Sequence, residues 1–122
     1  MFSRIFLLCA LVCSLTAATA QQIRSQAAFR LLQTAQTLME VQQLEAAEQY
    51  FNKGLSRAIA NNDTYSQAYA YQGLGTLYSK LDQNKKAEEN YQKSLKLYQS
   101  LKLPVLANMV ESLLKSVQGV GD

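Results

Sequence analysis

Several kinds of residue on which enzymes and metal sites depend are scarce in this chain of 122 residues. It contains no histidine and no tryptophan, and its two cysteines, Cys9 and Cys13, both lie near the N-terminus. Without imidazole there is neither a histidine base nor a histidine metal ligand. Glycine-rich phosphate loops and metal-ligand spacings are missing too. These absences predict that the protein is not an enzyme, with no catalytic residues, no metal and no cofactor.

Helix breakers and strand signals are also scarce. Pro104 is the only proline, and β-branched residues never alternate with polar residues over a useful length. Long stretches are rich in Ala, Leu, Gln, Glu and Lys, which favour helices. The predicted fold class is therefore all-α.

The first twenty residues have the three parts of a secretory signal peptide. Arg4 supplies a positive charge, residues 5–15 are an apolar run, and Ala18 and Ala20 give the A-x-A pattern of a cleavage site. The run is about half of the roughly 20 residues that a membrane-spanning helix needs. We therefore expect cleavage after Ala20, in preference to a retained anchor. The mature protein would be periplasmic or secreted, with no membrane insertion after signal removal.

Residues 21–122 are expected to form one domain. This part of the chain has 11 basic and 9 acidic residues and no cysteine, so packing alone must hold it together. Its basic residues are scattered rather than clustered. No nucleic acid is therefore expected as a partner.

Apolar spacing and breaks predict five helices joined by short connections, as in stacked antiparallel hairpins. Thr64 and Gln67 are interpreted as a capping box, and Asp82 as the N-cap of the following helix. Pro104 suits the first turn of the last helix. The expected helices span residues 23–41, 44–60, 64–81, 83–101 and 104–118.

The last of these helices is amphipathic, which the end of a helical stack requires. Its polar face carries Asn108, Glu111, Lys115 and Gln118. About half of its circumference is apolar and is expected to be buried: Val105, Leu106, Met109, Val110, Leu113, Leu114 and Val117.

The chain also repeats itself with a period of 40 residues. Residues 47–55 align with residues 87–95, with Ala, Glu, Lys and Leu identical and Phe51 opposite Tyr91. A fixed period in this range is typical of a solenoid. Small residues recur at matching positions, where two helices are expected to approach closely: Ala35 and Gly75, Ala47 and Ala87, Gly54 and Ser94.

Residues 68–101 resemble a tetratricopeptide repeat, with matches at that family's signature spacing: Tyr71, Leu74, Gly75, Tyr78, Ala87, Tyr91, Ser94 and Leu95. Residues 28–61 resemble the repeat more weakly, with Thr34 where leucine is usual, and Gln99 stands where the second copy would have its terminal proline. The resemblance implies a short right-handed solenoid of two repeats, closed by a capping helix at residues 104–118.

The resemblance further implies a stripe that binds a partner on the first helix of each repeat. In this sequence the stripe consists of Phe29, Leu32, Gln36 and Met39, followed by Tyr69, Gln72, Thr76 and Ser79. The lysine, arginine and asparagine with which some family members grip a C-terminal carboxylate are missing from it, so that specificity is not expected. Phe29, Leu32 and Met39 could equally well pack in the core, since exposed and buried apolar residues share one helical period.

Two functions are compatible with these features. The first is an exported module that binds a peptide or protein partner. The alternative is a structural, self-assembling helical scaffold of the envelope without a ligand groove, because two repeats are fewer than the three that a stable stack usually needs. Apolar residues surround much of the first helix, so we expect it to make the principal intermolecular contact, with a partner or with a second copy in a homo-oligomer.

Overall fold

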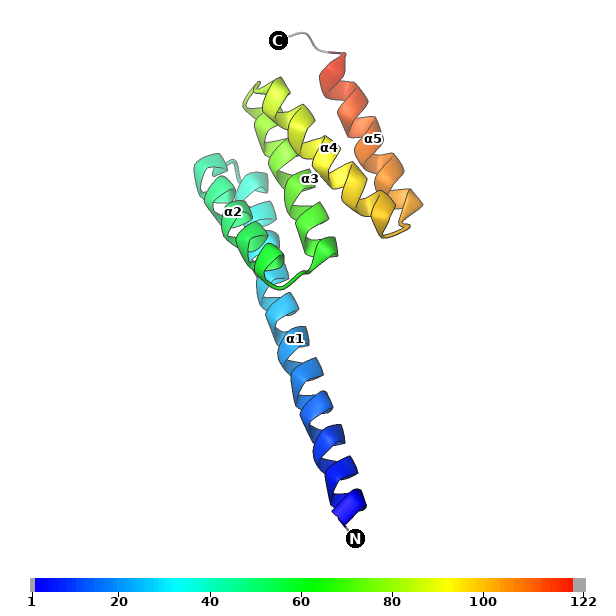
Figure 1. The fold of residues 1–122 in the computed structure, drawn as a ribbon. Helices are drawn as coiled ribbons and strands as arrows, with labels where there is room; N and C mark the ends of the chain where they lie inside the picture. Colours follow the sequence, from blue (N-terminus) through cyan, green and yellow to red (C-terminus); the bar gives the residue numbers. More distant parts are fainter. Residues whose placement is uncertain (1, 120–122) are drawn as a thin grey trace.

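A computed structural model describes residues 2–119 and shows, over that range, five α-helices and no strand. Met1 and residues 120–122, which belong to the expected signal peptide and domain, lie outside the described residues. Consecutive helices pack against one another along the chain (Figure 1), which confirms the all-α repeat solenoid. The helices are α1 (Phe2–Glu40), α2 (Leu44–Ala60), α3 (Thr64–Lys80), α4 (Asn84–Ser100) and α5 (Pro104–Gln118).

The connections between the helices are four turns of one kind. In each turn, the backbone N–H of the third residue donates to the carbonyl of the residue five positions earlier, as in a Schellman motif. For example, Asp63 N–H donates to Ala58 O at 2.9 Å. A helix and its turn thus make a unit of 20 residues, and two such units give the period of 40. The middle residue of each turn has left-handed backbone: Gln42 (φ 64°), Asn62 (φ 54°), Asp82 (φ 58°) and Lys102 (φ 56°).

The predicted caps of α3 and α4 are wrong by one residue. Asp63, rather than Thr64, is the N-cap of α3, because its carboxylate accepts from Ser66 N–H at 3.1 Å and from Ser66 Oγ at 2.6 Å. Asp82 occupies the left-handed position of its turn, and Gln83 stands at the N-cap of α4 without a side-chain cap bond. Aspartate adopts left-handed backbone more readily than most residues, so Asp82 suits the turn.

Two apolar clusters form the core. In the first, Phe51 of α2 packs with Leu32 of α1 and Leu77 of α3, and all three are fully buried. In the second, Tyr91 and Tyr98 of α4 pack with residues of α3 and α5. The small residues expected at close helix contacts are all buried: Ala35, Ala47, Gly54, Gly75, Ala87 and Ser94.

Two glycines of α3 are required by the rings beside them. A Cβ added to Gly73 would lie 2.2 Å from the Phe51 ring, and one added to Gly75 would lie 2.6 Å from the Tyr91 ring. Both distances are far below van der Waals contact, so α3 can approach α2 and α4 this closely only because these positions have no side chain.

A polar side of α1 closes the N-terminal end of the stack. This is clear when residues of α1, α3 and α5 that lie 40 positions apart in the sequence are compared. Three positions of α3 pack toward the preceding helix: Ala70, Gly73 and Leu77. Their equivalents on α5 pack toward α4: Val110, Leu113 and Val117. Their equivalents on α1, which has no preceding helix in the described chain, are exposed and polar: Arg30, Gln33 and Thr37. The outer side of α1 is therefore hydrophilic.

This arrangement corrects the expectation that apolar residues surround the exposed part of the first helix. Leu32 and Ala35 are fully buried, and Met39 is 3% exposed, because this side of α1 packs against α2 and α3. Met39 can therefore contact another molecule only through the small part of its side chain that remains exposed.

The C-terminal end of the stack is closed in a similar way. Three positions of α3 pack toward the following helix, α4: Ala68, Gly75 and Tyr78. Their equivalents on α5 are exposed and polar: Asn108, Lys115 and Gln118. Glu111 Oε1 lies 3.6 Å from Lys115 Nζ on this side. A further helix docked here would bury these charged groups at a cost, so this side of α5 has the polar character that was expected of the last helix.

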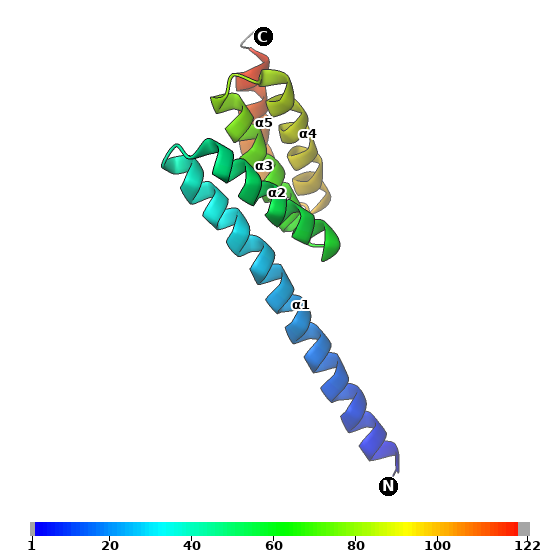
Figure 2. The ribbon, with the colours of Figure 1, turned by 90° about the vertical axis from the view of Figure 1, so that its left-hand side faces the viewer.

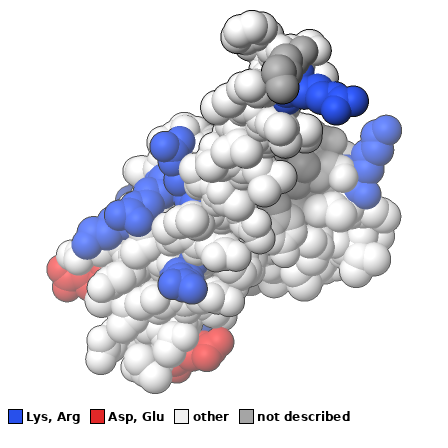
Figure 3. Space-filling model, turned by 90° about the horizontal axis from the view of Figure 1, so that it is seen from below, with Lys and Arg blue, Asp and Glu red and all other residues white. Residues whose placement is uncertain are grey.

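The N-terminal half of α1 projects from the body as one continuous helix (Figures 1 and 2). Residues 2–20 are all exposed, and the hydrogen bonds that their side chains make are local ones within α1. Viewed from below, most of the projecting helix is uncharged, with a basic side chain beside its tip (Figure 3). By length and composition α1 could cross a membrane, a property that an N-terminal signal sequence shares.

Candidate binding face

One side of α1, α3 and α5 remains at least partly exposed on all three helices, and we call it the inner face. Residues on it recur every 40 positions, so that Phe29, Tyr69 and Met109 correspond to one another, as do Tyr65 and Val105. The inner face comprises Ser25, Phe29 and Gln36 on α1, Tyr65, Tyr69, Gln72 and Thr76 on α3, and Val105, Met109, Ser112 and Ser116 on α5.

Aromatic rings gather on the inner face where α1 passes the beginning of α3. The ring centroids of Phe29 and Tyr65 are 6.3 Å apart, and those of Phe29 and Tyr69 are 5.3 Å apart. Tyr98 of α4 meets Tyr65 edge-on, with centroids 6.1 Å apart. Such tilted arrangements are favourable for aromatic pairs, so the cluster is a preformed apolar surface.

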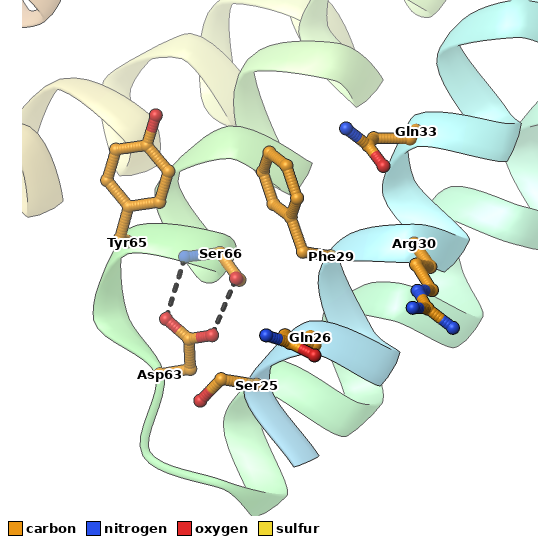
Figure 4. A pocket seen from close by; sticks show the side chains of 8 residues that line it. All are labelled: Ser25, Gln26, Phe29, Arg30, Gln33, Asp63, Tyr65 and Ser66. Atoms are coloured by element: carbon orange, nitrogen blue, oxygen red, sulfur yellow. Dashed lines mark hydrogen bonds between the residues drawn. The ribbon is translucent and has the colours of Figure 1, made fainter. Parts of the chain in front are cut away.

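A hollow of about 370 Å³ opens beside these rings (Figure 4). Phe29 and Tyr65 reach into it from α1 and α3, and the Gln33 amide lies near its edge. Asp63 also lines the hollow, but both of its carboxylate oxygens are bonded to Ser66, as the dashed lines in Figure 4 mark. The hollow thus offers aromatic walls and a polar rim.

A second hollow, of about 230 Å³, lies farther along between α1 and α3 and has amide and hydroxyl groups in its lining. Tyr98 Oη donates to Gln72 Oε1 at 3.1 Å, which leaves the Gln72 amide nitrogen for another acceptor. Thr76 Oγ1 lies 2.9 Å from Tyr91 Oη, so that hydroxyl is also held in place. This hollow therefore offers oriented polar groups rather than an apolar surface.

Burial favours the neutral form of two tyrosines at the inner face, Tyr69 and its neighbour Tyr98 of α4. Burial is the main cause that raises the pKa of Tyr69, with smaller contributions from Tyr65 and Glu40. Burial likewise raises the pKa of Tyr98, assisted by Tyr65 and Tyr69. None of the inner-face residues carries a charge at neutral pH. Arg30 also lines the first hollow, but its side chain points away from the rings of Phe29 and Tyr65 (Figure 4). A charged ligand group buried among these rings would therefore lose hydration without gaining an ion pair.

The structure brings together most of the stripe residues expected from the sequence. Gln36, Met39, Tyr69, Gln72 and Thr76 line the second hollow, and Phe29 lines the first. Ser79 is partly exposed and lines neither. Leu32 is fully buried, so it belongs to the core, and Met39 shows only its edge.

Six residues of the inner face were not expected from the sequence: Ser25, Tyr65, Val105, Met109, Ser112 and Ser116. Three of these are exposed large apolar or aromatic residues. Tyr65 is 41% exposed, Val105 80% and Met109 43%, although the last two had been placed on the buried side of their helix. The 40-residue shift could have found Met109, because it follows Phe29 and Tyr69 in register. The period had been applied to two copies only, and α5 is the first helix of a third.

Over residues 2–119, no three histidine, cysteine, aspartate or glutamate side chains are grouped so that they could hold a metal ion. Every buried side-chain nitrogen and oxygen in that range has a hydrogen-bond partner. The arrangement can exclude water and bind apolar and amide groups.

A stack of helical hairpins with polar ends and an exposed inner face defines a helical-repeat protein. A family model described as Tetratricopeptide repeat matches residues 27–100, and the chain belongs to that family. No curated protein matches the chain, and no solved structure matches it either. The family generally mediates binding between proteins and is typically non-catalytic.

Proposed function

We propose that the protein is an exported interaction module that binds an uncharged peptide segment of a partner protein on its inner face. The observation that carries this proposal is the aromatic cluster of the inner face, where Tyr65 and Tyr69 pack with Phe29 beside a hollow of about 370 Å³. Exposed apolar residues also occur outside the inner face, at Ile23, Val41, Ile59, Leu81 and Leu101, but none of these lines that hollow. A concave apolar surface with a few polar groups at its edge is typical of a binding site.

The chemistry of the inner face supports a particular kind of segment. Aromatic walls favour a large apolar side chain, above all an aromatic one, because edge-to-face pairs add to the gain from burial. A volume of about 370 Å³ leaves room for one such side chain beside Phe29 and Tyr65. The Gln72 amide and the Thr76 hydroxyl can bond to the backbone of the same segment, at a neighbouring position.

The chain offers a clean test, because it contains no tryptophan. Tryptophan emission then reports only on a peptide that carries one. We expect a neutral tryptophan peptide to shift its emission to the blue on binding. Versions with flanking Lys or Glu should bind more weakly, and the alanine counterpart, which gives no signal itself, should compete only weakly with the tryptophan peptide. Loss of one aromatic wall in Phe29→Ala should weaken binding by about 3- to 10-fold.

Ile59→Ala is the matched control, because Ile59 is a 51% exposed apolar residue of α2 outside the inner face. It should bind the peptide as the wild type does. If Phe29→Ala binds equally well, if charged peptides bind as tightly as neutral ones, or if the wild type binds none of them, the proposed specificity is wrong.

The proposal of export rests on the N-terminal half of α1. This half is apolar, exposed and near the N-terminus. Contact with the body begins at Gln21, whose Nε2 donates to Asn61 O at 2.9 Å. This contact, made by the residue that follows Ala20, supports cleavage at that point. Cell fractionation with N-terminal sequencing tests this, and a Met1 start in the membrane fraction would favour a retained anchor instead.

The scaffold alternative is less well supported. Assembly of copies end to end would need apolar end faces, and Arg30, Gln33, Lys115 and Gln118 stand there instead. Light scattering at increasing concentration distinguishes the two functions, since the proposed module needs no second copy.

A further inference from the structure

Gln21 stands at the junction between the projecting part of α1 and the folded body. Its side-chain Nε2 donates to the backbone carbonyl of Asn61, at the C-terminal end of α2, and Asn61 Nδ2 donates back to Arg24 O at 3.2 Å. Gln21 and Gln22 are nevertheless exposed, so cleavage after Ala20 would leave the first residue of the mature chain at the surface. These contacts tie the first turn of the domain to α2 without burying it.

Cleavage after Ala20, on which this inference rests, would create a positive charge in an unfavourable place. The new α-ammonium of Gln21 would lie at the N-terminal end of the remaining helix, where the helix dipole disfavours cations. Arg24 follows within one turn, and the first acidic residue of the mature sequence is Glu40. Asp63, which lines the same hollow as Ser25, already has both oxygens bonded to Ser66. These surroundings favour the neutral amine, which is the nucleophilic form.

We propose that Gln21 is a modification site, at which the released N-terminus cyclises to pyroglutamate. The neutral α-nitrogen attacks the side-chain Cδ of the same residue, a new Nα–Cδ bond forms, and the Cδ–Nε2 bond breaks. The proton that the α-nitrogen loses passes to the side-chain nitrogen, which departs as ammonia. No oxidant, reductant or further reactant is needed, and the product is a five-membered lactam.

The modification changes the junction in two ways. It removes the α-ammonium from the helix end, which relieves the conflict with the dipole and Arg24. It also removes Nε2, so that Asn61 O loses its donor from Gln21, while the bond from Asn61 Nδ2 to Arg24 O can persist. The mature domain would then begin with an uncharged, blocked residue on α1.

The test is the intact mass of the full-length gene product after expression in an exporting bacterium, with fragmentation of the N-terminal peptide. We expect the mass of residues 21–122 less one ammonia, with the loss located on Gln21. Gln21→Ala should be processed at the same bond and should show the full mass of its mature chain. Gln22→Ala, the matched control, should still lose one ammonia, which distinguishes cyclisation from loss at any other amide.

The outcomes separate this inference from the proposal on which it rests. A mature mass without loss of ammonia would overturn the modification and leave export intact. A product that retains residues 1–20 would overturn both, since Gln21 would have no free amine. Loss of ammonia in Gln21→Ala would place the reaction elsewhere and also overturn it.

Discussion

The two repeats fill the same packing position in different ways. In repeat 1 (residues 28–61), Leu32 is fully buried against Gly54, where an added Cβ would lie 2.4 Å from the leucine Cδ2. In repeat 2 (residues 68–101), the equivalent of Leu32 is Gln72, which is partly exposed, and the equivalent of Gly54 is Ser94. In repeat 1 a leucine thus packs into the notch that Gly54 leaves in α2, and in repeat 2 two polar side chains occupy the equivalent positions.

These polar side chains are held by hydrogen bonds. Ser94 Oγ donates to Ala68 O at 2.8 Å, and Gln72 Oε1 accepts from Tyr98 Oη at 3.1 Å. Repeat 1 therefore closes its part of the inner face with core residues, whereas repeat 2 leaves oriented amide and hydroxyl groups there. We therefore infer that repeat 1 supplies stability and the aromatic ring of Phe29, whereas repeat 2 supplies the polar contacts to a ligand.

The largest difference in stability is expected between the variants in which Leu32 or its equivalent, Gln72, is replaced by alanine. Leu32→Ala removes a fully buried side chain and should lower the free energy of unfolding by about 2–5 kcal/mol. Gln72→Ala loses one hydrogen bond at a partly exposed site and should cost about 1 kcal/mol or less. Urea denaturation measures both losses of stability. In the peptide titration the order should be reversed, so that Gln72→Ala weakens binding more than Leu32→Ala does.

Equal costs for the two variants would contradict the assignment of Leu32 to the core. So would a Leu32→Ala variant that stays stable but loses peptide binding.

The sequence allowed the five helices, the period and the family to be predicted, because each depends on local pattern. Apolar spacing places a residue on one side of a helix, and small residues mark close contacts such as those of Ala87. The same spacing could not tell whether Leu32 and Met39 face a neighbouring helix or a ligand, since this depends on where α2 and α3 lie. Nor could it show that Tyr65 of α3 meets Phe29 of α1, because that contact is set by the stacking of repeats.

A smaller difference in stability is expected between substitutions at the notch residue of repeat 1, Gly54, and at its equivalent in repeat 2, Ser94. Gly54→Ser places a side chain where Leu32 already lies, and such overpacking should cost about 1–3 kcal/mol. Ser94→Ala removes the bond to Ala68 O and should cost about 0.5–1.5 kcal/mol. Thermal and urea unfolding of the two variants measures the difference.

The double variant Leu32→Ala with Gly54→Ser gives a sharper test of the notch. Because the shortened residue 32 leaves room for the serine, the double variant should be more stable than the sum of the two single effects predicts. Additive effects would mean that the backbone absorbs the clash instead.

The smallest effect on stability is expected from removing the hydrogen bond between Tyr78 of repeat 2 and Glu48 of repeat 1. Tyr78 Oη donates to Glu48 Oε1 at 2.6 Å, whereas the equivalent residue in repeat 1, Leu38, has no hydroxyl. Burial, followed by the bond to Glu48, raises the pKa of Tyr78 from 10.0 to about 12. Tyr78→Phe should lower the free energy of unfolding by about 1 kcal/mol at neutral pH.

The pH dependence of this effect has a definite sign. Because the folded-state pKa of Tyr78 lies above the unfolded value, the phenol binds its proton more tightly in the folded state. Its stabilising contribution is complete below pH 10, the unfolded value, and is lost as the pH rises toward about 12. The stability difference between wild type and Tyr78→Phe should therefore be constant from pH 7 to about 9 and decrease above pH 10. Urea denaturation across this range, with Tyr50→Phe as the control at a partly exposed tyrosine of α2, measures it. A difference that grows with pH would show that the bond to Glu48 does not favour the protonated phenol.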